Sequence, residues 1–434
     1  MSQALRWRAA GFAAATLMLL SACQETSSVG DRNAAAEARR AGDCGAAVDF
    51  LLAVTQNYLD GLAETTATGP AASPSPPTDR PTAQQAAQEQ FATALQDIRG
   101  YAASRGCDPR GFQASLAQGL GSLSAGGPVA RAVLLQLQAD TDAGPRPRPG
   151  PLQPGDDVAA AVAAAKSGAT VQLAAGSFEL TETLALLRGV TLRGAGRGST
   201  VLQSAAAGGP LLVLTDEPVV LRDVSVRRTG EAPGPVLSVA PVATVELTGV
   251  RITGARADAE GLGGVGILMS GGSGGQKGPT RRVSLRVTDS EIFDNAVAGI
   301  VVAGEHRAEV TRTAVERSGQ CGVCYLGTSD GVVRDSRFTD NAAGIVAGDD
   351  ARPRIETSDL TGGQVGIQAI DRAAPVVTGT TVTRPARAAF VWTGAAAGRL
   401  DGNRCVEVPF GIVAGPATAP LLGENDCQVA RGEQ

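Results

Sequence analysis

The sequence predicts a mainly β protein, in which a parallel β-helix follows a small N-terminal α-helical domain. Three observations predict this fold. Short runs of Val, Ile, Leu and Thr recur about every 22 residues in the C-terminal part of the chain. Gly, Asp and Asn separate these runs, as they do in strands joined by tight turns. Aromatic residues make up only 3% of the chain, which also holds 56 glycines, and this balance suits small residues stacked in a regular repeat.

Composition excludes several functional classes. The chain has one histidine, His306, which rules out a metal site built from several histidines of this chain. The net charge of −5 argues against a general nucleic-acid binder, which would present a basic surface. The length of 434 residues is enough for two or three domains and for a core of the size found in enzymes.

Residues 1–22 have the features of an export signal. Arg6 and Arg8 supply positive charge, and the apolar stretch 9–20 is too short to span a bilayer comfortably. The tetrapeptide that ends at Cys23, LSAC, resembles a bacterial lipobox. The resemblance implies a lipid anchor on Cys23 and, because Gln24 rather than Asp follows, an outer-membrane location. An ordinary signal peptide is the alternative.

Residues 23–32 read as a polar tether, and residues 33–142 are expected to form a small helical domain. Apolar residues recur at helical spacing within 33–63, 82–105 and 129–137. A packed helical hairpin and a coiled segment that binds a partner both fit this pattern. Cys44 and Cys107 are placed to join the first two long helices by a disulfide. The Pro-rich stretch 143–155 then forms a semi-rigid linker.

The repeat of about 22 residues is the decisive feature of the C-terminal region. In each repeat a small residue precedes a large apolar one, and successive pairs lie 33, 23, 22, 22, 23 and 22 residues apart. The pairs begin at Gly266, Gly299, Gly322, Gly344, Gly366, Ala389 and Gly411. The long first interval contains a Gly-rich insertion, residues 270–282. Three short strands and three turns fit one period, so each repeat predicts one coil, or rung, of a parallel β-helix.

This region resembles the pectin-lyase-like superfamily of right-handed β-helices. The resemblance rests on an Ala/Val-rich segment at 156–166, on the step Gly176-Ser-Phe178, and on the segment GVTLRG at 189–194. These features look like the N-terminal cap and first rungs of that family. The resemblance implies a right-handed, single-stranded solenoid of about eleven rungs over residues 156–430.

Equivalent positions of successive repeats form columns that run along the β-helix. Because side chains alternate along a strand, each column faces either inward or outward. One large apolar column should face inward: Ile300, Val323, Ile345, Ile367, Phe390 and Ile412. The next column should face outward, together with the glycines that open each run: Val301, Cys324, Val346, Gln368, Val391 and Val413. An apolar outward stripe fits two interpretations. One is plain β-propensity, and the other is a groove that docks the N-terminal helices, a partner or a glycan.

The six cysteines other than Cys23 suit disulfides in an oxidising compartment. Cys405 and Cys427 lie 22 residues apart, which is one rung, so they should stack about 4.8 Å apart and form a disulfide. Cys321 and Cys324 form a CxxC sequence, but side chains three residues apart on an extended strand point to opposite faces. A redox pair, a local disulfide on a distorted strand end and two separate thiols are all open at this point.

Polar residues align in the turns after the inward column and predict a ridge on the surface. The expected catalytic residues are Asp349, Asp350 and Asp371, and the expected substrate-binding residues are Glu305, His306, Asp330, Arg352 and Arg372. Carboxylates about 5 Å apart can act as general acid and base on a glycosidic bond. They could instead bind calcium beside an arginine base, as the resemblance to lyases implies. Solvated turn residues are the third interpretation.

Family motifs do not extend the resemblance to one enzyme. Gly348-Asp349-Asp350 resembles the central motif of the polygalacturonases, but no His or Lys follows it, and the Asp-Pro-His-Asp motif of the alginate epimerases is absent. Two functions are therefore expected. The first is an exported lipoprotein that binds, and could cleave, a cell-envelope or extracellular polysaccharide, with calcium as the one cofactor to test. The second is a non-catalytic envelope scaffold that docks a partner protein.

Overall fold

A computed structural model describes residues 44–67, 107, 109–140, 150–240, 243–261, 263–270 and 284–431 of the chain. The chain divides into two compact units. One consists of Met1–Pro149 and Asp157–Lys166, and the other of Gly150–Asp156 and Ser167–Gln434. The signal segment, with Cys23, and the helix predicted over 82–105 lie outside the described residues.

The first unit is helical. Its described helices are α3 (Cys44–Ala67), α5 (Pro109–Leu120), α6 (Pro128–Asp140) and α7 (Val158–Ala164). Helix α3 packs against α5 and α6, and α6 packs against α7. A disulfide joins Cys44, at the start of α3, to Cys107, with the two Cα atoms 6.0 Å apart. Helix α7, which the sequence resemblance places at the start of the β-helix, thus groups with the helical unit.

The packing of this unit follows the apolar spacing in its sequence. Leu51 and Tyr58 of α3 are buried, as are Leu116 of α5 and Val133 of α6. Among the helices that the structure describes, none is long and apolar enough to cross a membrane.

The second unit is a parallel β-helix with three sheets, here named sheets I, II and III. Sheet I contains β1 (Thr170–Gln172), β4 (Thr191–Arg193), β7 (Pro218–Arg222), β10 (Thr244–Thr248), β13 (Ser284–Thr288), β16 (Arg307–Thr311), β19 (Asp330–Arg334), β22 (Arg352–Glu356), β25 (Val376–Thr378), β28 (Arg399–Asp401) and β31 (Leu421–Leu422). Sheet II contains β2 (Gly176–Glu179), β5 (Thr200–Ser204), β8 (Ser225–Arg228), β11 (Arg251–Thr253), β14 (Glu291–Phe293), β17 (Ala314–Glu316), β20 (Arg337–Thr339), β23 (Asp359–Thr361), β26 (Thr381–Thr383) and β29 (Arg404–Val406). Sheet III contains β3 (Leu184–Leu186), β6 (Leu211–Val213), β9 (Leu237–Val239), β12 (Val265–Ser270), β15 (Ala298–Gly304), β18 (Cys321–Gly327), β21 (Ala343–Ala347), β24 (Val365–Ala369), β27 (Ala388–Trp392), β30 (Phe410–Ala414) and β32 (Val429–Arg431).

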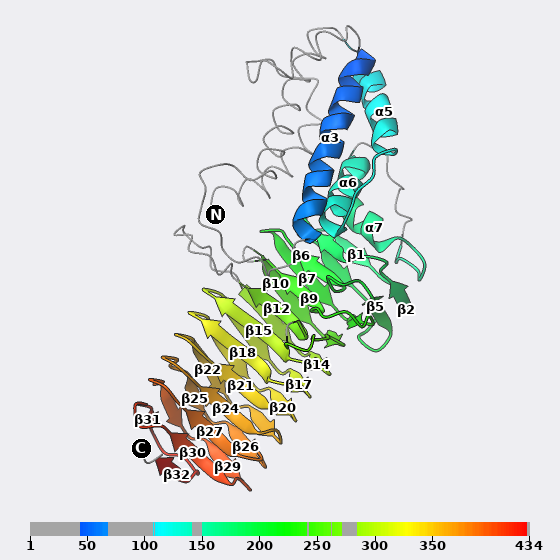
Figure 1. Ribbon diagram of the computed structural model, residues 1–434. Helices are drawn as coiled ribbons and strands as arrows, with labels where there is room; N and C mark the ends of the chain where they lie inside the picture. Colours follow the sequence, from blue (N-terminus) through cyan, green and yellow to red (C-terminus); the bar gives the residue numbers. More distant parts are fainter. Residues whose placement is uncertain are drawn as a thin grey trace, which may run out of the picture. The chain divides into compact units, whose positions relative to one another are not determined.

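The rungs stack in sequence order, each strand pairing with the equivalent strand of the next rung, as Figure 1 shows from green to red. The register confirms the predicted repeat. Ile300 pairs with Val323, and the ladder continues through Ile345 and Ile367 to Phe390. All of these side chains are fully buried. The interior is thus a column of branched apolar residues, which explains why aromatic residues are few.

The corner between sheets I and II is built the same way in successive rungs. One residue takes the left-handed conformation, with φ between 45° and 52° at Asp289, Arg312, Asp335 and Thr357. The next residue is buried and polar and points inward, and these residues are Ser290, Thr313, Ser336, Ser358, Thr380 and Asn403. Hydrogen bonds link this inner ladder: Ser336 Oγ accepts from the Thr313 amide at 3.2 Å. The left-handed residue is therefore held outward at a fixed position in each rung.

The glycines of sheet III do not face outward as predicted. A Cβ added to Gly344 would lie 2.4 Å from Leu360 Cδ2, which belongs to the interior. A Cβ on Gly299 would likewise meet the interior side chains of Val315 and Ile292. In the strands that contain this glycine, the glycine and the residue after it both face inward and the register leaves the glycine pair out, so the residue before the glycine faces outward instead. The assignment of the Val301 column to the outer face is correct, and only that of the glycines is wrong.

Candidate functional site

The predicted ridge follows the strands of sheet III. Asp349 and Asp371 are exposed there and take the left-handed conformation, with φ of 55° and 58°. Their carboxylates accept hydrogen bonds from backbone amides. Asp349 Oδ2 accepts a hydrogen bond from the Gly327 amide at 2.7 Å, and Asp371 Oδ2 accepts one from the Asp349 amide at 3.3 Å. These two side chains therefore fix the turns of neighbouring rungs to one another.

Asp350 is held by an arginine of the next rung. Nε of Arg372 donates to Oδ1 of Asp350 at 2.8 Å, and Nη2 donates to Oδ2 at 2.5 Å. The Arg372 guanidinium lowers the pKa of Asp350 below its ordinary range. A general acid needs a raised pKa so that it carries a proton near neutral pH. Asp350 is thus suited to remain a carboxylate.

Of the other predicted binding residues, some have exposed side chains and one is buried in the interior. Glu305 and Arg352 are exposed, and Asp330 is half-buried with its Oδ1 3.4 Å from Nη1 of Arg307. His306 differs from the expectation, because its side chain is only 2% exposed. It occupies the inward position of its turn, which Ser329 occupies in the next rung. Its burial lowers its pKa, so the ring is neutral inside the solenoid and does not face a ligand on the ridge.

The carboxylates of the ridge do not gather into a group that would hold a metal ion by themselves. Among the residues that the structure describes, no group of three His, Cys, Asp or Glu side chains is arranged to hold a metal ion.

The outer face of sheet III is apolar. Val265, Ala298 and Cys321 form a buried cluster there. Partly buried side chains pack against it, and these are Leu268, Val297, Val301, Cys324 and Val346. Cys321 and Cys324 form a disulfide with Cα atoms 5.9 Å apart, much closer than the roughly 10 Å of an extended strand. The break in alternation at Gly322 places both sulfur atoms on one face, so the local disulfide is the alternative that the structure supports.

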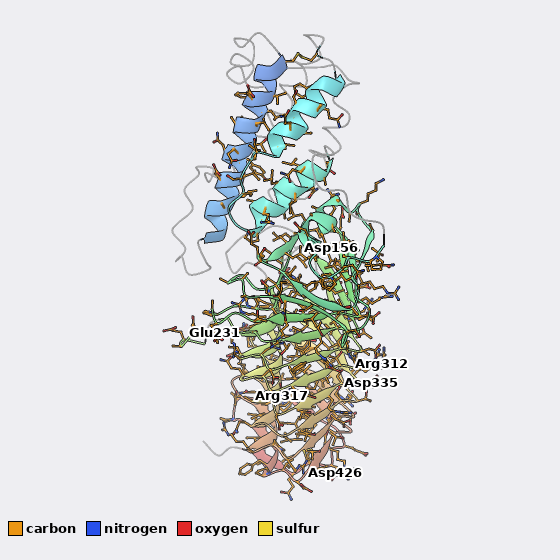
Figure 2. All side chains as sticks on the ribbon, turned by 90° about the vertical axis from the view of Figure 1, so that its right-hand side faces the viewer. Asp156, Glu231, Arg312, Arg317, Asp335 and Asp426 are labelled. Carbon is orange, nitrogen blue, oxygen red and sulfur yellow. A yellow bond between two sulfur atoms is a disulfide. The ribbon has the colours of Figure 1, made fainter. Side chains whose placement is uncertain are left out.

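A cleft of about 330 Å³ lies at another place, on the corner between sheets I and II. Its lining includes two columns of residues spaced one rung apart. The corner column consists of Asp289, Arg312 and Asp335, and the sheet II column of Glu291, Ala314 and Arg337. Figure 2 shows Arg312 and Asp335 together at one edge of the β-helical unit. The small side chain of Ala314 stands between two long ones, so the surface is hollowed above it.

Arg197, which is distant in the sequence from the other residues of the cleft, forms one side of it. It belongs to the Gly-rich loop between β4 and β5, and Ser225 Oγ donates to its backbone carbonyl at 2.5 Å. Its Nη1 donates to the Asp289 carbonyl at 2.6 Å, and its Nη2 lies 3.1 Å from Glu291 Oε1. The loop thus reaches along the corner to the rung of β13 and β14.

Arginines neutralise the carboxylates of the cleft. Arg312 donates to both oxygens of Asp289, at 2.7 and 2.9 Å, and these hydrogen bonds lower the pKa of Asp289. Arg251 donates to Glu291 Oε2 at 2.8 Å. Arg337 differs from them, because within the described residues its exposed guanidinium forms no ion pair or hydrogen bond. The cleft therefore presents one arginine that is free to bind a ligand.

Sequence reasoning missed this cleft. The spacing of 23 residues between Glu291, Ala314 and Arg337 was readable from the repeat and would have placed them in one outer column. The contribution of Arg197 carries no such signal, because 92 residues separate it from Asp289.

Residues 265–419 match the family model described as "Right handed beta helix region". No curated protein sequence matches the chain. Among solved structures, the ORF18 protein of Geobacillus virus E2 is similar at 9% identity, with a TM-score of 0.46, over 63% of this chain and 57% of that one. The catalytic domain of a GH87 alpha-1,3-glucanase in complex with nigerose is similar at 12% identity, with a TM-score of 0.43, over 71% of this chain and 65% of that one. An alginate lyase from a Paenibacillus species is similar at 14% identity, with a TM-score of 0.38, over 61% of this chain and 93% of that one.

This chain thus spans less than two thirds of the length of the virus protein and of the glucanase domain. Identities this low transfer no activity. The sheet register and the family match together identify residues 265–419 as a right-handed parallel β-helix.

Proposed function

We propose that this protein binds a polysaccharide of the cell envelope or the extracellular medium and does not cleave it. The observation that carries the proposal is the regular array of polar side chains on the outer face of sheet II. One column continues from Arg337 through Asp359 and Thr381 to Arg404, and a parallel column contains Thr339, Thr361 and Thr383. The rungs repeat every 4.7–4.9 Å or so. A linear polymer of hydroxylated units can meet a threonine hydroxyl at successive rungs of the second column and a hydrogen-bonding side chain of changing type along the first.

The state of the ridge argues for binding without hydrolysis. Hydrolysis of a glycosidic bond needs one carboxyl that is protonated near neutral pH and a second that is ionised. Arg372 lowers the pKa of Asp350, so this carboxyl is ionised near neutral pH. His306 is buried and cannot supply the proton in its place.

The experiment titrates the purified protein with alginate, polygalacturonate, a glycosaminoglycan and a neutral glucan, each with and without calcium. We expect saturable binding to at least one of the polymers, with no new reducing ends and no unsaturated product. Failure to bind any of them contradicts the proposal. Product formation contradicts the binding-only part, and Asp350→Asn then tests whether the ridge is responsible.

Export is supported by the disulfides. The described residues contain three, and structural disulfides are typical of proteins outside the reducing cytosol. We propose in addition that Cys23 carries a lipid, on the strength of the LSAC sequence that precedes Gln24. Cys23→Ala should then abolish metabolic labelling by palmitate and release the chain from membranes. Labelling that persists in Cys23→Ala contradicts the anchor.

Docking of an envelope protein is the second candidate function. The apolar outer face of sheet III favours it, because a solvated sheet face usually carries polar side chains. A photo-crosslinking residue at Val346 should capture a partner in cells, whereas one at Thr361 on sheet II should not. Equal crosslinking at both positions, or none at Val346, contradicts docking on this face.

A further inference from the structure

We infer that the cleft above Ala314 binds a carboxylated sugar, a uronate unit, within the polysaccharide. This inference rests on the proposed function and adds the position of one subsite and its ligand class. The cleft volume of about 330 Å³ is at the small end of the roughly 300–1,000 Å³ found for ligand pockets. It therefore suits one sugar unit rather than a long segment.

The pairing of charges in the cleft leaves one position for an anion. Three arginines, Arg197, Arg312 and Arg337, and three carboxylates, Asp289, Glu291 and Asp335, line the cleft, and Arg251 and Arg334 form ion pairs with two of these carboxylates from outside it. The carboxylates of Asp289 and Glu291 already accept bonds from arginines. Among the arginines that line the cleft, Arg337 is the one whose guanidinium forms no ion pair or hydrogen bond with the described residues. Its planar guanidinium can bind a carboxylate through two parallel hydrogen bonds.

The remaining groups favour a sugar over a simple anion. Asp335 and Glu291 stand on either side of Ala314, and carboxylate oxygens can accept hydrogen bonds from sugar hydroxyls. Thr357 Oγ1 donates to Asp335 Oδ1 at 2.5 Å and fixes the orientation of that carboxylate. A ligand that offers both a carboxylate and hydroxyl donors satisfies both sides of the cleft, whereas inorganic sulfate or phosphate satisfies only the arginines.

The cleft is also well placed for a polymer. Ala314 belongs to the same outer column of sheet II as Arg337, Asp359 and Thr381. A chain bound along this column can place one carboxylate at Arg337 and continue over the next rungs. The subsite therefore adds charge recognition to the array of the proposed function.

The test uses the full chain and two substitutions that act by different means. Arg337→Ala removes the free cation, and Ala314→Leu fills the hollow without changing charge. Matched controls lie on sheet I, outside the array and the cleft: Arg193→Ala, which removes an exposed arginine, and Thr248→Leu, which adds the same side chain elsewhere. Binding of hexagalacturonate, maltohexaose and inorganic sulfate is measured by calorimetry, and thermal unfolding confirms that each variant is folded.

We expect Arg337→Ala to weaken hexagalacturonate binding by about tenfold or more, since a hydrogen bond to a charged group contributes roughly that much. Ala314→Leu should weaken it by a similar factor, because the larger side chain occupies the space of the sugar. The two controls should bind within about twofold of the unmodified protein. Higher salt should weaken hexagalacturonate binding and leave any binding of maltohexaose unchanged.

Three outcomes overturn the inference. Equal binding by all four variants means that the uronate lies elsewhere, and the proposed function then stands without this subsite. Sulfate that competes as strongly as hexagalacturonate means that the cleft holds a simple anion rather than a sugar. Absence of binding to every polysaccharide tested contradicts the proposed function and the subsite together.

Discussion

Arg372 and Asp350 form a two-point ion pair across one rung of the β-helix, with Nε–Oδ1 and Nη2–Oδ2 distances of 2.8 and 2.5 Å. The pair joins a turn of the rung that contains β22 to the same turn of the next rung. Because of this pair, Asp350, which the sequence predicted to be catalytic, is an ionised surface carboxylate bound to an arginine. The chemical consequence of the pair can be measured directly.

Replacing Arg372 by Ala should raise the pKa of Asp350 toward its ordinary range. The hydrogen bond from Arg372 is the largest cause of the low pKa, and the charge of Arg352 contributes less. Titration of the labelled carboxyl by NMR should therefore show a larger rise in Arg372→Ala than in the control Arg352→Ala. An unchanged midpoint in Arg372→Ala contradicts the ion pair in solution.

The stability of the β-helix should fall as the pH is lowered below about 6.5, the ordinary pKa of histidine. Burial lowers the pKa of His306 in the folded state, so between that pKa and 6.5 the unfolded chain binds the proton more strongly. The contribution of His306 to stability is therefore present above pH 6.5 and is lost as the pH falls through the folded-state pKa. The slope cannot exceed about 1.4 kcal/mol per pH unit for one proton.

Urea unfolding between pH 5.5 and 8 measures this effect, with His306→Leu as the comparison. The variant should lack the slope, and it should be no less stable at pH 5.5, since neither ring nitrogen of His306 has a hydrogen-bond partner among the described residues. Assignment is simple because the sequence has no other histidine. The same slope in both proteins would show that another group titrates.

The period of the sequence was enough to predict the solenoid, its register and its inward column. Because every rung repeats the same pairing, the spacing of Ile300, Val323 and Ile345 translates directly into neighbouring strands. The same logic places Cys405 beside Cys427, which form a disulfide with Cα atoms 5.1 Å apart. A repeat fixes neighbours along the stack because the stacking distance is set by backbone hydrogen bonds.

Side-chain direction was less predictable wherever the backbone departs from simple alternation. At Gly322 and the equivalent glycines of sheet III two successive residues face inward, so the two-residue period fails across them and Cys321 joins Cys324 on the outer face. His306 was misplaced for a related reason, because it lies in a turn, where alternation gives no direction. The cleft depends on Arg197, whose loop crosses rungs and follows no repeat.

Substituting Gly344 by Ala should destabilise the β-helix by roughly 1–3 kcal/mol, the usual range for overpacking a filled core. The added Cβ would lie 2.4 Å from Leu360 Cδ2 and 2.7 Å from the carbonyl oxygen of Gly366. The second atom belongs to the backbone of the next rung and cannot move alone. Gly198→Ala is the matched control, because nothing lies within 4 Å of its added Cβ, and its effect should stay within about 0.5 kcal/mol. Equal effects of the two substitutions on urea unfolding would contradict the inward direction of Gly344.

Removing the Cys405–Cys427 disulfide should destabilise the C-terminal rungs more than removing the Cys321–Cys324 disulfide. The first spans 22 residues and the second only 3, and the chain-entropy model gives about 3 kcal/mol for a loop of the longer size and roughly half of that for the shorter. The structure adds a local reason. Sheet II ends at β29, so on this side of the last rung the disulfide, an isolated bridge between Arg404 and Asp426 and a few turn hydrogen bonds take the place of a strand ladder. Hydrogen exchange should therefore accelerate first in β30 and β31 when both cysteines of that pair are changed to Ser, while β15 and β18 keep their protection. Loss of protection that is uniform along the solenoid would show that the rungs unfold as one unit and that this disulfide has no special role at its end.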